Sequence, residues 1–295
     1  MIPTFVIFLR EGVEASMIIA ILLSYLGRIG QRRHFRDVFV GVAFAFVLIL
    51  VGGVAAFILI SQYQGSSVQT YFETITYVIA AAVMTGMTVW MHQHARTMSA
   101  ELQARSDTAL TTGNRVGLGL LAFQSVGREG LETMVFTLAI IFASTRQAAT
   151  PLHGNLLLVG AVLGLVVSLA IAFAIYRLGA KVNLKLFFRG LGLLLMFFAA
   201  GLLVDAVQNL QQLGWLTVGT HVLWHTNGAL SEASNFGDIL HSLLGYSDHP
   251  TVLQGVVWVI YVSASLAALI GLGRRPHSNS APMPASVSPT PTRPH

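Results

Sequence analysis

Seven apolar stretches, each long enough to cross a lipid bilayer as a helix, take up most of this 295-residue chain. A spanning helix needs about 20 mostly apolar residues. Only 10% of the residues are charged, against roughly 25% in soluble domains. The sequence therefore predicts an all-α polytopic membrane protein. The expected spans lie near residues 3–27, 38–60, 71–92, 116–142, 155–177, 187–210 and 252–272.

The spans leave little room for anything else. We expect one transmembrane domain over residues 1–272, followed by a Pro- and Ser-rich tail over 273–295 that reads as a disordered cytoplasmic extension. The chain has no cysteine, which excludes disulfides and thiolate metal sites. The one long polar connection, 211–251, contains four histidines that we interpret as solvated loop residues: His221, His225, His241 and His249.

The basic residues lie almost entirely in alternate connections. Of the seventeen Lys and Arg residues, fourteen fall on one expected side of the membrane, one falls on the other, and two lie inside spans. The net charge of +5 is thus a topology signal and does not indicate a nucleic-acid partner. Because basic loops stay in the cytoplasm, we expect an inner-membrane protein with its N-terminus outside and its C-terminus inside. The fourteen residues are Arg28, Arg32, Arg33, Arg36, Arg96, Arg105, Arg115, Arg177, Lys181, Lys185, Arg189, Arg274, Arg275 and Arg293.

A five-residue pattern occurs twice inside expected spans. Residues 10–14 read Arg-Glu-Gly-Val-Glu, and residues 128–132 read Arg-Glu-Gly-Leu-Glu. Three spans separate the two copies, so the helices that carry them run antiparallel. This arrangement predicts an inverted repeat, spans one to three against spans four to six, with a seventh span appended. Transporters built in this way usually bind substrate near the midplane, where the repeats meet.

The spacing inside each copy places charges on one helix face. Residues three or four apart are neighbours on a helix, so Glu11 lies beside Glu14, and Arg10 can reach Glu14. The same holds for Arg128, Glu129 and Glu132. The glycines at 12 and 130 remove side-chain bulk and allow another helix to approach closely.

These charges are expensive in a membrane. Each costs about 2.5–3.5 kcal/mol at a helix centre, while a Leu or Ile returns about 0.3–0.6 kcal/mol. Pairing each arginine with one glutamate leaves about two carboxylates uncompensated, and a multivalent cation would neutralise them. Carboxylates suit hard ions such as Mg, Ca, Mn or ferric iron. The alternative is that the motifs are buried ion pairs that only fix helix packing.

The pair of motifs, the seven spans and the outside N-terminus resemble the oxidase-dependent iron permease family, which includes the fungal high-affinity iron permease and bacterial EfeU-type permeases. The resemblance covers roughly residues 1–272. Further similar stretches are Trp90-Met91, Ala95-Arg96, Glu101-Leu102, Asn209-Leu210-Gln211-Gln212 and Gly214-Trp215. An acidic outer-loop motif of the fungal members has only a loose counterpart here, in residues 231–234.

The resemblance implies a permease and not an enzyme. It implies that iron, as transported ferric ion and not as a permanently bound cofactor, is held by Glu11, Glu14, Glu129 and Glu132, with Arg10 and Arg128 in support. It also implies a partner outside the membrane that oxidises or delivers iron.

Accessory residues and rival functions complete the expectations. Asp205 could extend the cation path, and Gln124 and Ser125 could hold the second motif by hydrogen bonds. One rival is a transporter of another hard cation, such as Mn, Ca or Pb. A second is a membrane-embedded di-iron carboxylate enzyme, although the His that such bundles place three residues after a Glu is replaced here by Met17 and Val135.

Overall fold

The computed structural model describes residues 1–63, 65–94, 103–108, 115–145, 151–178, 184–226, 230–231 and 234–274. Their secondary structure is helical, apart from an isolated antiparallel bridge between Val222 and Thr251. The expectation of an all-α protein is confirmed for these residues. Residues 275–295, which make up most of the expected disordered tail, lie outside them.

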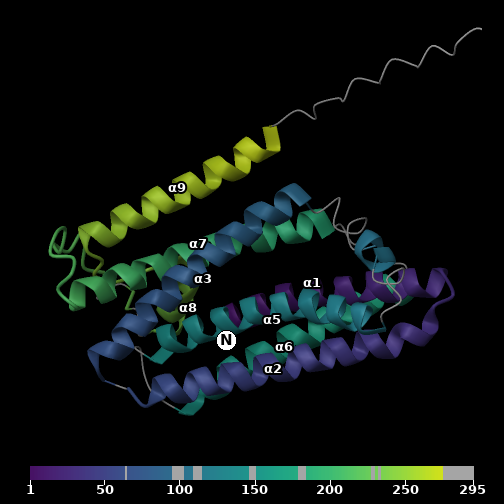
Figure 1. The fold of residues 1–295 in the computed structure, drawn as a ribbon. Coiled ribbons are helices and arrows are strands. Elements are labelled where there is room, and N and C mark those ends of the chain that lie inside the picture. The colour runs from purple at the N-terminus through teal and green to yellow at the C-terminus, as the bar shows by residue number, and fades with distance from the viewer. Residues whose placement is uncertain are drawn as a thin grey trace, which may run out of the picture.

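Helices occupy all seven expected segments, with ends that shift by a few residues (Figure 1). The last of them extends two residues into the expected tail. Their bounds are α1 Ile2–Arg28, α2 Phe35–Ser61, α3 Ser67–His94, α5 Arg115–Thr145, α6 Pro151–Leu178, α7 Leu184–Gln212 and α9 Val252–Arg274.

Length and composition qualify α2, α3, α6, α7 and α9 as candidate membrane spans. The outermost helices present large apolar side chains to their surroundings, among them Phe46, Leu158 and Ile260, each more than 60% exposed. Such a surface is incompatible with water and matches lipid. The chain is therefore a multi-pass membrane protein. α1 and α5 are of similar length, at 27 and 31 residues, but each carries three charges near its middle.

The helices pack in pairs that are distant in sequence. α1 lies along α6, α5 along α2, and α3 along α7, while α1 and α5 also contact each other inside the bundle. Glycines permit the closest approaches, as the motif spacing predicted. A Cβ at Gly12 would overlap the Ser168 side chain of α6, and one at Gly130 would overlap Ile49 of α2.

Hydropathy did not predict a short helix between α7 and α9. α8, Asn235–Leu244, lies within the 211–251 connection and packs against α7. The Ser234 hydroxyl caps its first turn by accepting from the Gly237 N–H at 3.0 Å. Gly245 ends it in the left-handed conformation, with φ of 69°, which costs glycine little. We call this end of the bundle the α8 end; the α1–α2 connection lies at the opposite end (Figure 1).

Candidate metal-binding site

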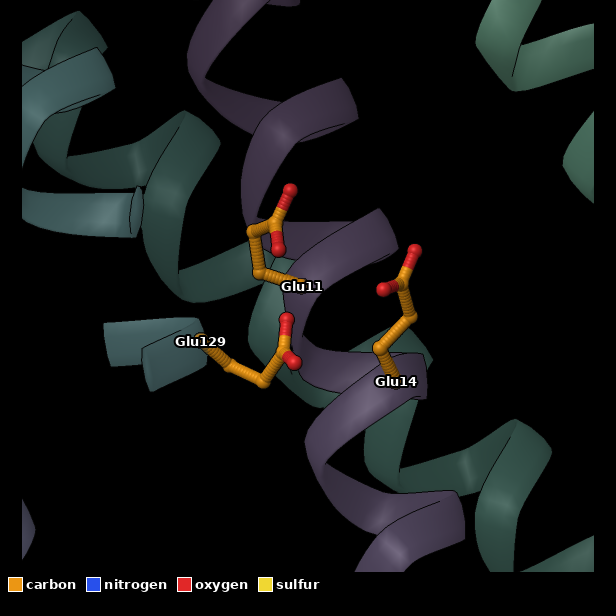
Figure 2. Close-up of side chains that lie close together, drawn as sticks. All are labelled: Glu11, Glu14 and Glu129. Atoms are coloured by element: carbon orange, nitrogen blue, oxygen red, sulfur yellow. The ribbon is translucent and has the colours of Figure 1, made fainter. Parts of the chain in front are cut away.

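Three carboxylates from two helices meet inside the bundle. Glu11 and Glu14 come from α1, and Glu129 reaches toward them from α5 (Figure 2). One oxygen of each lies within 4.8 Å of the others. All three residues are less than 8% exposed. The structure thus brings the two distant copies of the motif into one cluster, which we call the carboxylate cluster.

Arg10 holds the α1 side of the cluster. Its Nη1 donates to Glu11 Oε1 at 2.9 Å, and its Nε lies 3.2 Å from Glu14 Oε1. The arginine is itself only 2% exposed. The predicted pairing four residues apart is therefore present, and a second pairing to the adjacent glutamate accompanies it. This arrangement compensates part of the buried charge and orients both carboxylates.

The second motif is arranged differently. Arg128 Nε donates to Glu132 Oε1 at 3.1 Å, again four residues apart, but the arginine side chain is 49% exposed. Its guanidinium lies 5.0 Å from the centre of the Trp90 ring of α3, a cation–π distance. Glu132 is buried but does not belong to the group of three oxygens within 4.8 Å. Two motifs of nearly identical sequence therefore occupy unequal environments.

The close packing of α1 and α5 against their neighbours explains the burial. The glycine between the two glutamates of each motif faces another helix, Ser168 for Gly12 and Ile49 for Gly130. These contacts remove water from the helix surfaces beside the charges. The glutamates are thus turned inward, where the two motif helices meet.

Buried carboxylate oxygens without a hydrogen-bond donor remain in both motifs. Among the described residues, Oε2 of Glu11, of Glu129 and of Glu132 has no such partner. Two negative charges 4.8 Å apart repel by about 3.5 kcal/mol at an effective dielectric constant of 20. With all groups ionised, four glutamates and two arginines carry a net charge of −2. The three glutamates form a group of oxygen donors that could hold a cation.

The accessory residues fall elsewhere. Gln124 is exposed and Ser125 half-buried, and within the described part of the chain neither donates to a motif carboxylate. Asp205 of α7 is 5% exposed and lies outside the cluster. Its carboxylate instead faces His241 of α8, with Oδ1 and Nε2 3.8 Å apart.

Two residues near these sites were not anticipated. Trp90 was noted only for family resemblance, and no local pattern indicates its contact with Arg128. The interpretation of the polar-loop histidines as solvated is wrong for His241, whose side chain is only 11% exposed. A signal was available there, because Ser234 followed by an amphipathic decapeptide is typical of a capped helix.

Comparison with known proteins bears on the origin of this arrangement. The model of the family described as "Iron permease FTR1 family" matches residues 1–273. The chain belongs to the iron permease FTR1 family. The resemblance that the two motifs indicated is confirmed, and iron transport across a membrane is the activity that this family description names.

Individual relatives agree with the family match. The chain is 34% identical to "Ferrous iron permease EfeU" of Escherichia coli O6:K15:H31 over 275 residues, which cover 92% of this chain and 95% of the relative. It is also 34% identical to the protein of the same name from Yersinia pestis over 271 residues, 90% of this chain and 92% of the relative. No solved structure matches the chain significantly.

Proposed function

We propose that the protein imports iron across the cytoplasmic membrane and that the carboxylate cluster is its transport site. The observation that carries the proposal is the convergence of Glu11, Glu14 and Glu129 from two helices, with buried oxygens that lack hydrogen-bond donors. Glu132 is the fourth ligand, available once the two motif helices shift relative to each other. Arg10 and Arg128 compensate the negative charge of the motif glutamates while no iron is bound.

An inverted repeat of three plus three helices, with α9 appended, is the architecture that we propose for transport. The pairwise packing supports it, because exchanging the two triplets turns the α1–α6 contact into the α5–α2 contact and maps the α3–α7 contact onto itself. In this arrangement the two triplets alternate to expose the cluster to each side of the membrane. The distribution of basic residues supports an orientation with the α8 end outside.

Ferric and ferrous iron are the two candidate substrates. An all-carboxylate donor set suits the harder ferric ion, which is the expectation from sequence. The net charge of −2 and the relatives' name, ferrous iron permease, favour ferrous iron as the second candidate. The proposed extracytoplasmic oxidising or delivering partner is needed only for ferric iron.

A di-iron enzyme is the weaker alternative. The described residues that could hold a metal as a group of three are all glutamates, and no histidine belongs to the cluster. Relatives are named as permeases. Transport of iron is therefore favoured over oxygen chemistry on iron.

Uptake of radioactive iron tests the proposal in cells that lack their own iron importers. We expect uptake with the intact protein and none with Glu14→Gln or Glu132→Gln. The matched control is Glu73→Gln in α3, where Glu73 is also buried but accepts from Gln69 Nε2 at 2.7 Å, away from the cluster. Membrane abundance is measured for every variant.

Normal uptake by both motif variants, at equal abundance, would show that the motifs only fix packing. Uptake is then measured with iron kept reduced by ascorbate, and with ferrous iron sequestered by a chelator specific for it. Comparing uptake under the two conditions decides which oxidation state is transported. Competition with manganese, calcium and lead decides whether iron is the preferred cation.

A further inference from the structure

An apolar groove runs along the first half of α9, where this helix follows the 211–251 connection. Its volume is about 620 Å³, within the range of about 300–1,000 Å³ that is typical of ligand pockets. Residues of α9 form one wall, and residues of α8 and of the connection on both sides of α8 form the other. None of the described lining residues is charged, and none belongs to either motif. The groove is therefore separate from the carboxylate cluster.

The polar atoms of the two tryptophans in the groove already have partners in its walls. Nε1 of Trp258 donates to the Leu244 carbonyl oxygen at 2.7 Å, and Nε1 of Trp224 donates to the Ser247 carbonyl oxygen at 3.3 Å. The two rings therefore offer the groove apolar surface. Because apolar cavities stay dry, water is a poor occupant.

The groove opens on the lipid-facing surface of the protein. α9 is a candidate membrane span, and only 11% of the residues in its apolar stretch are buried, so most of the helix meets lipid. Val256, Val259 and Ile260 line the groove and are also 46%, 56% and 63% exposed. The groove and the lipid-facing surface of α9 are thus continuous.

The length of the groove matches one leaflet of the bilayer. Its lining residues on α9 run from Val252, the first residue of the helix, to Ile260. At a rise of 1.5 Å per residue, this distance is about 12 Å. One leaflet contributes half of a hydrocarbon core of about 30 Å, which is about 15 Å. The groove therefore covers most of the depth that one acyl chain occupies.

A second copy of the chain suits the groove less well. Helices associate in membranes through small residues that allow their backbones to approach, whereas α9 presents branched side chains to the groove. The small residues of α9 lie mostly in its other half, among them Ser263, Ala264, Ala267 and Ala268. The groove therefore does not have the features of a helix-packing surface.

We propose that this groove binds an acyl chain of a phospholipid from the leaflet around the α8 end. The chain fills the space between α9 and α8 and so fixes the 211–251 connection against the last span. The headgroup plays no part in selection, because no described lining residue carries a charge. The inference requires only that the protein lies in a membrane and does not rest on the proposed function.

The test is native mass spectrometry of the full-length protein, transferred into detergent from vesicles of phosphatidylcholine or of phosphatidylglycerol. Val256→Trp fills the groove from α9, and Leu244→Ser removes apolar surface from the opposite wall without adding bulk. Ile270→Trp is the matched control, because it adds the same ring to a position of α9 that is 55% exposed and is not among the described lining residues.

We expect the intact protein and Ile270→Trp to retain one phospholipid per chain, equally from both kinds of vesicle. Val256→Trp and Leu244→Ser should lose it. Thermal unfolding checks that each variant is folded, and if one of the two groove variants is not, the other decides. Added phosphatidylcholine should raise the unfolding midpoint of the intact protein but not that of Val256→Trp.

Three results would overturn the inference. The first is an intact protein that retains no phospholipid, and the second is equal retention by the intact protein and both groove variants. The third is retention of phosphatidylglycerol alone, which would assign the binding to the headgroup. A dimer without lipid that Val256→Trp dissociates would be a form of the first result and would place a second copy in the groove.

Discussion

Replacing Glu129 by glutamine tests two properties of the carboxylate cluster separately. One is the repulsion that destabilises the iron-free protein, and the other is the binding of iron. Glu129 is the α5 member of the cluster, and among the described residues no arginine or lysine forms an ion pair with it. Glu11 and Glu14, in contrast, both pair with Arg10. The substitution keeps size and shape, removes one charge and leaves the ion pairs in place.

The magnitude follows from the distances. Glu129 lies within 4.8 Å of two other carboxylates, each of which repels it by about 3.5 kcal/mol at an effective dielectric constant of 20. Relaxation of the surroundings absorbs most of this energy, so we expect the iron-free variant to be more stable than the intact protein by about 1–2 kcal/mol. Iron at a hundred times its dissociation constant stabilises a protein by about 2.7 kcal/mol, and the variant should lose this gain.

Thermal unfolding in nanodiscs, with and without anaerobic Fe²⁺, measures both effects, and uptake into liposomes measures transport. We expect a higher midpoint without iron, no rise with iron and no uptake. The control is Glu14→Gln, which should lower the iron-free midpoint because it removes a partner of buried Arg10. A Glu129→Gln variant that iron stabilises as much as the intact protein would refute the reasoning.

Three further substitutions test other parts of the structure. Arg10→Gln should destabilise the protein by about 3–5 kcal/mol, because it leaves two buried carboxylates without their cation. Membrane abundance and the unfolding midpoint measure this loss of stability. Abundance equal to that of the intact protein would contradict the prediction. Trp90→Ala should lower uptake about two- to fivefold by removing a cation–π contact of about 0.5–1 kcal/mol with Arg128. Trp90→Phe keeps an aromatic ring and should retain part of the uptake. Equal uptake by the two variants would argue against the contact. Gly41→Ala should cost about 1–3 kcal/mol, because its Cβ would overlap backbone of α5, whereas Gly86→Ala, with open space around it, should cost nothing; unfolding midpoints compare the two.

Much of the site could be predicted because its chemistry is local. The pairing of Arg10 with Glu14, and of Arg128 with Glu132, follows from helical spacing alone. The cost of placing charges in apolar helices singles out both motifs as candidate functional sites without any tertiary information. Gly12 was likewise identifiable as a point of close helix approach.

The membership of the cluster could not be predicted in the same way. Both glutamates of α1 belong to it, but only Glu129 of the second motif lies within the 4.8 Å group. That difference depends on how far α5 is rotated and shifted against α1. Helix rotation is set by side chains from several other helices, and the motif itself does not encode it.

The sequence by itself determined that the chain enters a membrane, which stretches become helices, and that two charged motifs lie inside them. These properties follow from hydropathy and from contacts within one helix turn. Only the tertiary structure decided that Arg10 is buried while Arg128 is half-exposed over Trp90, and that His241 meets Asp205 across a 3.8 Å gap. The pairs Arg128–Trp90 and His241–Asp205 each join residues from two different helices. Their distances, like the burial of Arg10, depend on the packing of the whole bundle.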